Sequence, residues 1–252
     1  TTATITPSAI GAVENAGTTP SIQSGTFAAL PAAGTTGRLY VTSDTNAIYR
    51  DSGAAWAQVG ESAILYTENP SSPVASTVSG TNAIALGSNN TAAGTSVMAT
   101  GSGASSSNYG AEVRANGNFS TVGDAQSGKY ILRNTTSNNT QTEVFLDGSS
   151  ARIVLPNNSA FTYYAQVACH RTDATGSNGA WEIRGMIKRD ANAASTALVG
   201  TRTRTVLTRP SAAWDAEVTA DTTNGALTFR VTGVNGNTVR WVVTVFTTEV
   251  KS

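Results

Sequence analysis

Apolar and polar residues alternate with a period of two along most of the C-terminal half of the chain. A period of two is typical of β-strands with one buried face, and strands of this kind are predicted at 142–148, 151–156, 161–170, 180–190, 197–208, 214–221, 226–233 and 238–250. We expect Trp181, Ile183 and Ile187 to point inward. Asn224-Gly225 and Asn235-Gly236 are strong hairpin signals. Residues 140–252 are therefore predicted to form an antiparallel, jelly-roll-like β-sandwich.

A different pattern, of small residues with a fixed period, runs from residue 83 to 124. Written in fourteens it reads AIALGSNNTAAGTS, VMATGSGASSSNYG and AEVRANGNFSTVGD, with Gly87 and Gly101 in the same place and a degenerate third copy. One short strand and one glycine turn per copy predict the coils of a β-solenoid. The alternative is a low-complexity linker. Because each coil is poor in apolar residues, we expect it to be covered by neighbouring coils or by other chains, and residues 80–139 are assigned to a trimeric β-roll or prism shaft.

The N-terminal part has less pattern. Residues 1–37 hold one charged side chain, Glu14, and three prolines, which predicts an extended arm that attaches to a larger particle, or else a flexible tail. Residues 38–79 form a small β module and connector. Within it, strands are predicted at 39–42, 47–50 and 56–59, and three strands of this length require a partner surface, most simply copies of themselves.

The composition agrees with an all-β chain and excludes several classes. Thr is abundant, with 39 residues, charged residues make up 13 % and the net charge is zero. One Cys and one His exclude a disulfide framework and a zinc site within one chain. No cofactor or metal is expected. No apolar run is long enough to span a membrane, the first 20 residues do not resemble a signal peptide, and three Lys make nucleic-acid binding by a basic tail improbable.

Catalytic constellations are hard to find in the sequence. Asp173 is the nearest acidic partner for His170, but no GxSxG motif supplies an activated serine. Cys169 precedes His170 on a strand, where successive side chains point to opposite faces. No pair of carboxylates for glycoside cleavage is evident. We therefore predict no catalytic residues within one chain, and we assign no residues to a binding surface. A trimer can also build a site between chains, which the sequence of one chain does not show.

The charge is distributed unevenly. Residues 151–252 carry eleven basic and seven acidic side chains, and the earlier part of the chain has an acidic excess. The arginines of the C-terminal strands, among them Arg171, Arg184, Arg202 and Arg204, could form a basic surface that meets an anionic envelope or capsid patch. Ion pairs on ordinary strand faces are the favoured interpretation.

Three stretches resemble known families. The first two fourteens resemble the head repeat of trimeric autotransporter adhesins, which implies a trimeric β-roll. The segment GRLYVTSDTNAIYRDSGAAWAQVG (37–60) resembles a module of bacteriophage tail and fibre proteins. The stretches AWEIRGMIKRD, TALVGTRTRTVLTRPSAAWDAEVTADTTNGALTFRVTG and TVRWVVTVFTTEV resemble C-terminal domains of phage structural proteins, including those of cyanophages.

Together these patterns and resemblances predict a non-enzymatic, homotrimeric bacteriophage virion protein, assembled in the cytoplasm of the host bacterium. It would be either a short head or tail fibre that binds the host or a capsid decoration (cement) protein. Its partners would be copies of itself, the major capsid protein or tail proteins through the arm, and a host-surface glycan, with no nucleic acid and no membrane insertion. The alternative is a glycan-active enzyme of the tailspike type.

Overall fold

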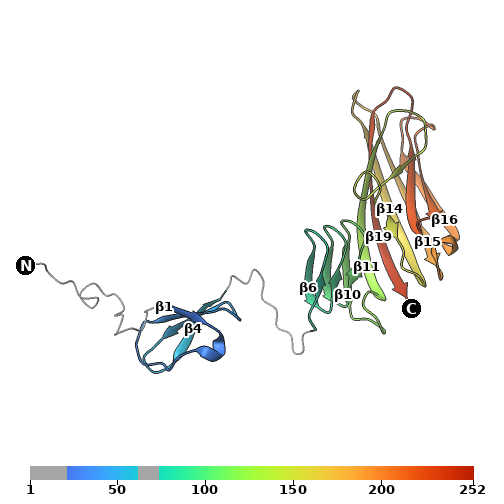
Figure 1. Ribbon diagram of the computed structural model, residues 1–252. Helices are drawn as coiled ribbons and strands as arrows, with labels where there is room; N and C mark the ends of the chain where they lie inside the picture. The colour runs from blue at the N-terminus through green and yellow to red at the C-terminus, as the bar shows by residue number, and fades with distance from the viewer. Residues whose placement is uncertain (1–21, 62–73) are drawn as a thin grey trace, which may run out of the picture. The chain divides into compact units, whose positions relative to one another are not determined.

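The computed structural model describes residues 22–61 and 74–252, and every regular element longer than a 3-10 turn in these ranges is a β-strand. No helix in these two ranges is long and apolar enough to cross a membrane. The chain divides into two compact units, 1–69 and 70–252 (Figure 1), which are described separately.

The N-terminal unit is a four-stranded sheet in the order β1-β2-β3-β4. Its strands are β1 (Ile22–Gly25), β2 (Leu39–Thr42), β3 (Ala47–Asp51) and β4 (Trp56–Glu61). The last three confirm the predicted strands at 39–42, 47–50 and 56–59. β1 was not predicted. It pairs in parallel with β2, so the chain between them must cross over the sheet.

That crossover corrects the interpretation of residues 1–37 as one extended arm. Buried Asp51 accepts hydrogen bonds from the backbone N–H groups of Gly34 and Thr35, at 3.0 and 2.9 Å. The indole N–H of Trp56 donates to the carbonyl of Pro31 at 2.7 Å. Residues 22–37 are therefore part of the small sheet, because β3 and β4 bind their backbone. The rest of the predicted arm, residues 1–21, lies outside the described residues.

Asp51 also forms the buried ion pair of this unit, with Arg38 at 2.6 Å. Burial alone would raise its pKa, but the hydrogen bonds from Arg38, Thr35, Gly53 and Gly34 hold the pKa of Asp51 well below its ordinary value. The carboxylate therefore stays charged and joins the crossover to β2 and β3.

The C-terminal unit begins with the coils that the fourteen-residue repeat predicts. β6 (Ile84–Ser88), β8 (Met98–Ser102) and β10 (Glu112–Asn116) pair in parallel, with Ile84 opposite Met98 and Met98 opposite Glu112. The short strands β5 (Thr77–Val78), β7 (Thr91–Ala92) and β9 (Ser105–Ser106) stack in the same register on the other side. The solenoid is thus confirmed, and the third copy, degenerate in sequence, keeps the register.

Small side chains fill the coil interior. The buried residues are Ala92, Val97, Ala99, Ala104, Ala111, Val113 and Ala115. At Gly87 and Gly101 φ is +108° and +90°, and an added Cβ would lie 2.0 Å from a carbonyl oxygen of the next coil. Only glycine lets the coils stack this closely, which is the physical reason for its recurrence at one place in the repeat.

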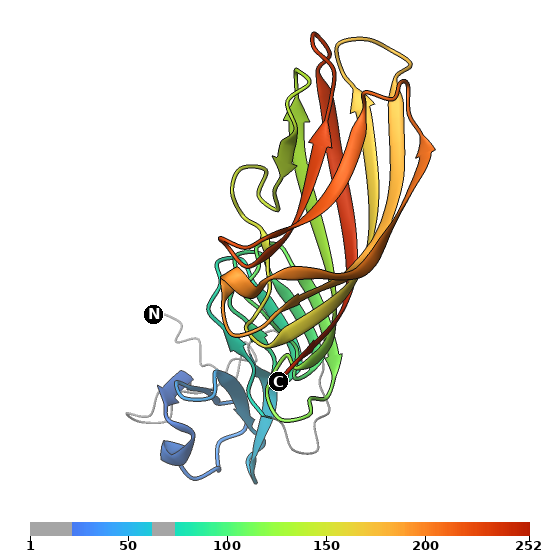
Figure 2. The ribbon, with the colours of Figure 1, turned by 90° about the vertical axis from the view of Figure 1, so that its right-hand side faces the viewer.

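The remaining strands form a β-sandwich. They are β11 (Ala125–Thr136), β12 (Thr142–Val144), β13 (Ile153–Val154), β14 (Ser159–Arg171), β15 (Asn178–Arg189), β16 (Ala197–Thr208), β17 (Asp215–Asp221), β18 (Ala226–Thr232) and β19 (Val239–Lys251). β12, β13 and β17 pair with β18 in a small sheet that lies against one face of the large sheet (Figure 2). The eight strands predicted for residues 140–252 are present, but the strand order gives no support to the jelly-roll detail.

The solenoid and the sandwich share one sheet, which the predicted division into a shaft at 80–139 and a sandwich at 140–252 did not anticipate. Its order is β16-β15-β14-β19-β11-β10-β8-β6 (Figure 1). β11, inside the segment assigned to the shaft, pairs with β10 on one side and along its whole length with β19 on the other. Continuous hydrogen bonding across this boundary connects the coils to the sandwich.

Three tryptophans dominate the core between the two sheets. The ring centroid of Trp241 lies 5.6 Å from that of Trp181 and 5.9 Å from that of Trp214. Trp181, Ile183 and Ile187 are fully buried, as their alternation predicts. Thr228 faces away from this core, yet it is also buried and bonded to Thr219, because β18 has paired strands on both of its sides.

Candidate functional site

The candidate residues of the sequence do not form a catalytic centre. Cys169 is buried, and burial raises the pKa of its thiol to about 12, so it carries almost no thiolate at neutral pH. His170 lies on the opposite face of β14 and its Nδ1 is 2.7 Å from Asn178 Oδ1. Asp173 is bound by Arg171 instead, at 2.9 Å. Within the described ranges no three His, Cys, Asp or Glu side chains gather where they could hold a metal ion.

The arginines of the C-terminal strands pair as the favoured interpretation expects. Arg171 binds Asp173. Arg184 binds Glu182 at 3.0 Å, and Arg202 and Arg204 lie within 4 Å of Glu217. These pairs neutralise most of the basic surface on β14, β15 and β16.

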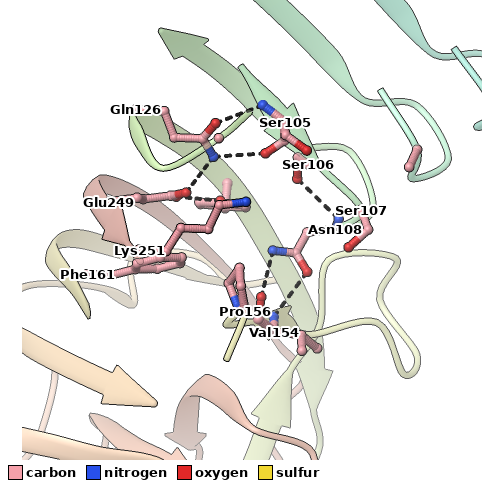
Figure 3. Close-up of a pocket in the computed structure, with 13 residues that line it drawn as sticks. Ser105, Ser106, Ser107, Asn108, Gln126, Val154, Pro156, Phe161, Glu249 and Lys251 are labelled. Atoms are coloured by element: carbon pink, nitrogen blue, oxygen red, sulfur yellow. Dashed lines mark hydrogen bonds between the residues drawn. The ribbon is translucent and has the colours of Figure 1, made fainter. Parts of the chain in front are cut away.

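A cavity of about 110 Å³ lies where the solenoid meets the sandwich (Figure 3). Two carboxamides bridge the junction there. The Gln126 side chain accepts from the Ser105 N–H and donates to the Ser105 carbonyl, at 2.8 and 2.9 Å. The Asn108 side chain likewise accepts from the Val154 N–H and donates to the Val154 carbonyl, and each hydrogen bond is 3.1 Å long. Each amide thus occupies a strand edge that would otherwise lack a partner.

Glu249, at the edge of this cavity, is buried and accepts three side-chain hydrogen bonds. Tyr130 donates at 2.6 Å, Gln126 at 2.7 Å and Thr247 at 2.6 Å. Gly128 makes this possible, because a Cβ there would lie 2.6 Å from both Glu249 Oε1 and Thr247 Oγ1. A carboxylate with its oxygens so fully occupied, beside a cavity of a few water volumes, is a structural anchor of the junction.

We expect this anchor to make the protein sensitive to alkali. Burial, and then the charge of Glu249, raise the pKa of Tyr130 well above its ordinary value. Above about pH 10 the unfolded chain loses this proton while the folded chain keeps it, so stability falls as pH rises. Urea unfolding between pH 8 and 11 measures the slope. Tyr130→Phe should reduce it, and an unchanged slope would contradict this role.

The outer face of the large sheet, which points away from the sandwich core and the coil interior, presents a row of side chains in register. Cross-strand pairing connects Glu112 with Lys129, Lys129 with Phe246, Phe246 with Tyr164 and Tyr164 with Arg184. Ile84 and Met98 continue the row across the coils. We call these seven residues the outer row. The amino-acid sequence could not reveal this row, because it does not show in which register distant strands pair.

The centre of the outer row is an aromatic stack. The rings of Phe246 and Tyr164 are stacked, with 6.4 Å between their centroids and 22° between their planes. The central carbon of the Arg184 guanidinium lies 4.6 Å from the centroid of the Tyr164 ring. Phe246 is 42 % exposed. Beside it is a groove of about 330 Å³, lined by Met98, Glu112, Lys129 and Phe246 among others. Exposed aromatic rings next to a groove are typical of ligand-binding surfaces.

Tyr164 is part of a small polar network at the end of this stack. Its hydroxyl donates to Glu182 at 2.6 Å and accepts from Gln166 at 3.1 Å. The hydrogen bond from Tyr164, with the nearby charge of Arg184, lowers the pKa of Glu182. Glu182 is therefore ionised at neutral pH and is placed to accept the hydroxyl proton of Tyr164.

No protein-family model matches the chain, and no curated protein is similar to it in sequence. Two solved structures show a partial likeness. One is the tailspike protein gp49 from the Acinetobacter baumannii bacteriophage Fri1, a capsular polysaccharide depolymerase, with 11 % identity over 62 % of this chain and a TM-score of 0.28. The other is the tailspike protein of the Acinetobacter phage vB_ApiP_P1, with 12 % identity over 68 % and a TM-score of 0.25. This chain spans 29 % and 38 % of their lengths.

These neighbours correct one expectation. The first is a depolymerase, and the prediction of a protein without enzymatic activity is contradicted by that comparison. Both neighbours are phage tailspikes, which agrees with the phage part of the prediction, whereas the cyanophage and adhesin resemblances have no counterpart here. Scores this low assign no residue of this chain a role.

Proposed function

We propose that this chain is part of a phage surface appendage and binds a polysaccharide of the host surface along the outer row. The observation that carries the proposal is the in-register stack of Phe246, Tyr164 and Arg184 beside an open groove. Sugar rings have apolar C–H faces that pack on aromatic rings, and their hydroxyls bond to flanking polar side chains. A sheet face that displays both kinds of group in rows suits an extended glycan.

The charges of the outer row favour this ligand over a nucleic acid. Lys129 is paired with Glu112 at 3.1 Å, and Arg184 with Glu182. A surface whose cations are already paired has little capacity to neutralise a row of phosphates. A polysaccharide with few charges requires no such capacity.

A second activity, cleavage of the bound glycan, is favoured by the Tyr164–Glu182 pair. Glu182 would accept the proton of Tyr164 while the phenolic oxygen bonds to an anomeric carbon and the glycosidic C–O bond breaks, with solvent protonating the leaving oxygen. Water would then attack the anomeric carbon, the phenolic oxygen would leave and take its proton back from Glu182, and the attacking water would lose a proton to solvent. Tyrosine is the nucleophile in some glycosidases, and an adjacent base is what activates such a group.

We propose a homotrimer attached to tail or capsid proteins, since the coils are poor in apolar residues and Val78, on the side of the coils away from the outer row, is exposed. Choosing between a tail fibre and a capsid decoration protein requires the copy number per virion.

The test is binding to bacterial surface polysaccharides on an array, followed by titration calorimetry. Phe246→Ala and Tyr164→Ala should each weaken binding about tenfold, since a lost aromatic contact is worth about 1 kcal/mol or more. Leu207→Ala, an exposed apolar residue on β16, is the matched control. If binding is unaffected but light scattering shows altered association between copies, the outer row is a self-association surface and the proposal is wrong.

The cleavage activity is tested separately, by release of reducing ends from the polysaccharide that binds. Tyr164→Phe keeps the ring and removes the hydroxyl, and Glu182→Gln keeps the shape and removes the base. Both should retain binding and lose cleavage. Cleavage that survives in both variants would place the catalytic groups elsewhere.

A further inference from the structure

The outer face carries a second row, two residues along each strand from the outer row. Cross-strand pairing joins Thr100 with Arg114, Arg114 with Ser127, Ser127 with Thr248 and Thr248 with Thr162. We call these five residues the hydroxyl row. The spacing between the two rows is about 7 Å, the rise of two strand residues. A single ligand of two or three sugar units can therefore contact both.

Arg114 is the one charged side chain in this row, and it differs from the cations of the outer row. In the ranges 22–61 and 74–252, no acidic side chain lies within ion-pair distance of it. Its cross-strand neighbours, Thr100 and Ser127, are hydroxyl residues, and Glu112 on the same strand is already bound by Lys129. The guanidinium thus keeps its donors available for a ligand.

A groove of about 500 Å³ leads to Arg114. Its outward side chains are Arg114, Asn116, Phe119, Ser127, Thr248 and Val250. Phe119 is 81 % exposed, an unusual state for an aromatic ring, and it comes from the loop after β10. Asp124 holds that loop, since its carboxylate accepts from the backbone N–H groups of Phe119, Ser120 and Thr121 at 2.7–2.8 Å. The ring is presented by a fixed turn beside a free cation.

We propose that this groove recognises a sugar that bears a carboxylate, such as a uronic acid unit. Arg114 binds the carboxylate, Phe119 packs against the ring, and Asn116, Ser127 and Thr248 bond to the hydroxyls. A guanidinium and a carboxylate form a charge-assisted pair of two parallel hydrogen bonds, which gives both affinity and selectivity. This inference rests on the proposed polysaccharide binding and specifies its substrate class as acidic.

The test compares each acidic polysaccharide that the protein binds with the same polysaccharide after chemical reduction of its carboxyl groups to alcohols. The wild-type protein should bind the native form at least about tenfold more tightly, the usual value of one charge-assisted pair. Arg114→Gln should bind the native and reduced forms equally. Phe119→Ala should weaken binding to both. Lys188 lies on β15 and its side chain is paired with Asp190, which follows that strand, so Lys188→Gln is the charge-matched control and should behave like the wild type.

Four results overturn the inference, and they differ in which part of the proposal survives. If the array yields only neutral polysaccharides, or if carboxyl reduction leaves the affinity unchanged, the carboxylate specificity is wrong while the polysaccharide-binding function survives. If Arg114→Gln still discriminates between the two forms, another cation is responsible. If no polysaccharide binds at all, the proposed function falls and this inference falls with it.

Discussion

Trp181→Ala should destabilise the C-terminal unit by about 3–5 kcal/mol, the usual range for removal of a fully buried indole. Its ring contacts Trp241, which in turn contacts Trp214, so the cavity would open at the centre of the contact between the two sheets. Among the residues that the structure describes, the indole N–H of Trp181 has no hydrogen-bond partner. The loss would therefore come from packing, and Trp181→Phe should recover a large part of it.

Urea unfolding followed by tryptophan fluorescence and circular dichroism measures this effect. Leu207→Ala, at an exposed apolar position on neighbouring β16, should change stability by less than about 0.5 kcal/mol. Thr228→Ala is a poorer control, because that hydroxyl is buried and bonded to Thr219. Equal unfolding midpoints for Trp181→Ala and Leu207→Ala would show that the three tryptophans are not the core.

Gly101→Ala should disrupt the stacking of the coils and destabilise the solenoid by about 3 kcal/mol or more, since a buried clash joins an unfavourable φ. The added methyl group would lie 2.0 Å from the Ala115 carbonyl oxygen. Because the contacting oxygen belongs to the backbone of β10, no side-chain rotation can relieve the contact. β8 and β10 would have to separate.

Gly110→Ala is the matched control for this effect. Gly110 also has a positive φ, +62°, but no atom of the described part of the chain lies within 4 Å of the position that a Cβ would take. The expected loss is about 1 kcal/mol, from backbone strain alone. Hydrogen exchange measures both variants, and the amides of β8 and β10 should lose protection in Gly101→Ala. Similar behaviour of the two would show that the coils do not stack through this glycine.

Much of the fold was predictable from local pattern. The alternation of apolar and polar residues in 180–190 predicted which side chains of β15 are buried, because side chains alternate between the two faces of a strand whatever it pairs with. The fourteen-residue repeat gave the coil register, because identical coils can stack only with equivalent positions aligned. The abundance of Thr favoured an all-β chain for a similarly local reason, because its branched side chain suits a pleated surface.

The tertiary structure alone decided which strands are neighbours and hence where the candidate site lies. β11 lies between the coils and β19, and its last residue, Thr136, is 103 residues before Val239, the first residue of β19. The pairing of β11 with β19 places Lys129 beside Phe246. Within 22–61 and 74–252 Arg114 has no acidic partner, because its neighbours across the sheet are Thr100 and Ser127, which register decides and sequence spacing does not. Long-range pairing depends on the whole core, so neither row of the outer face can be read from the amino-acid sequence, whereas the strands that carry them can.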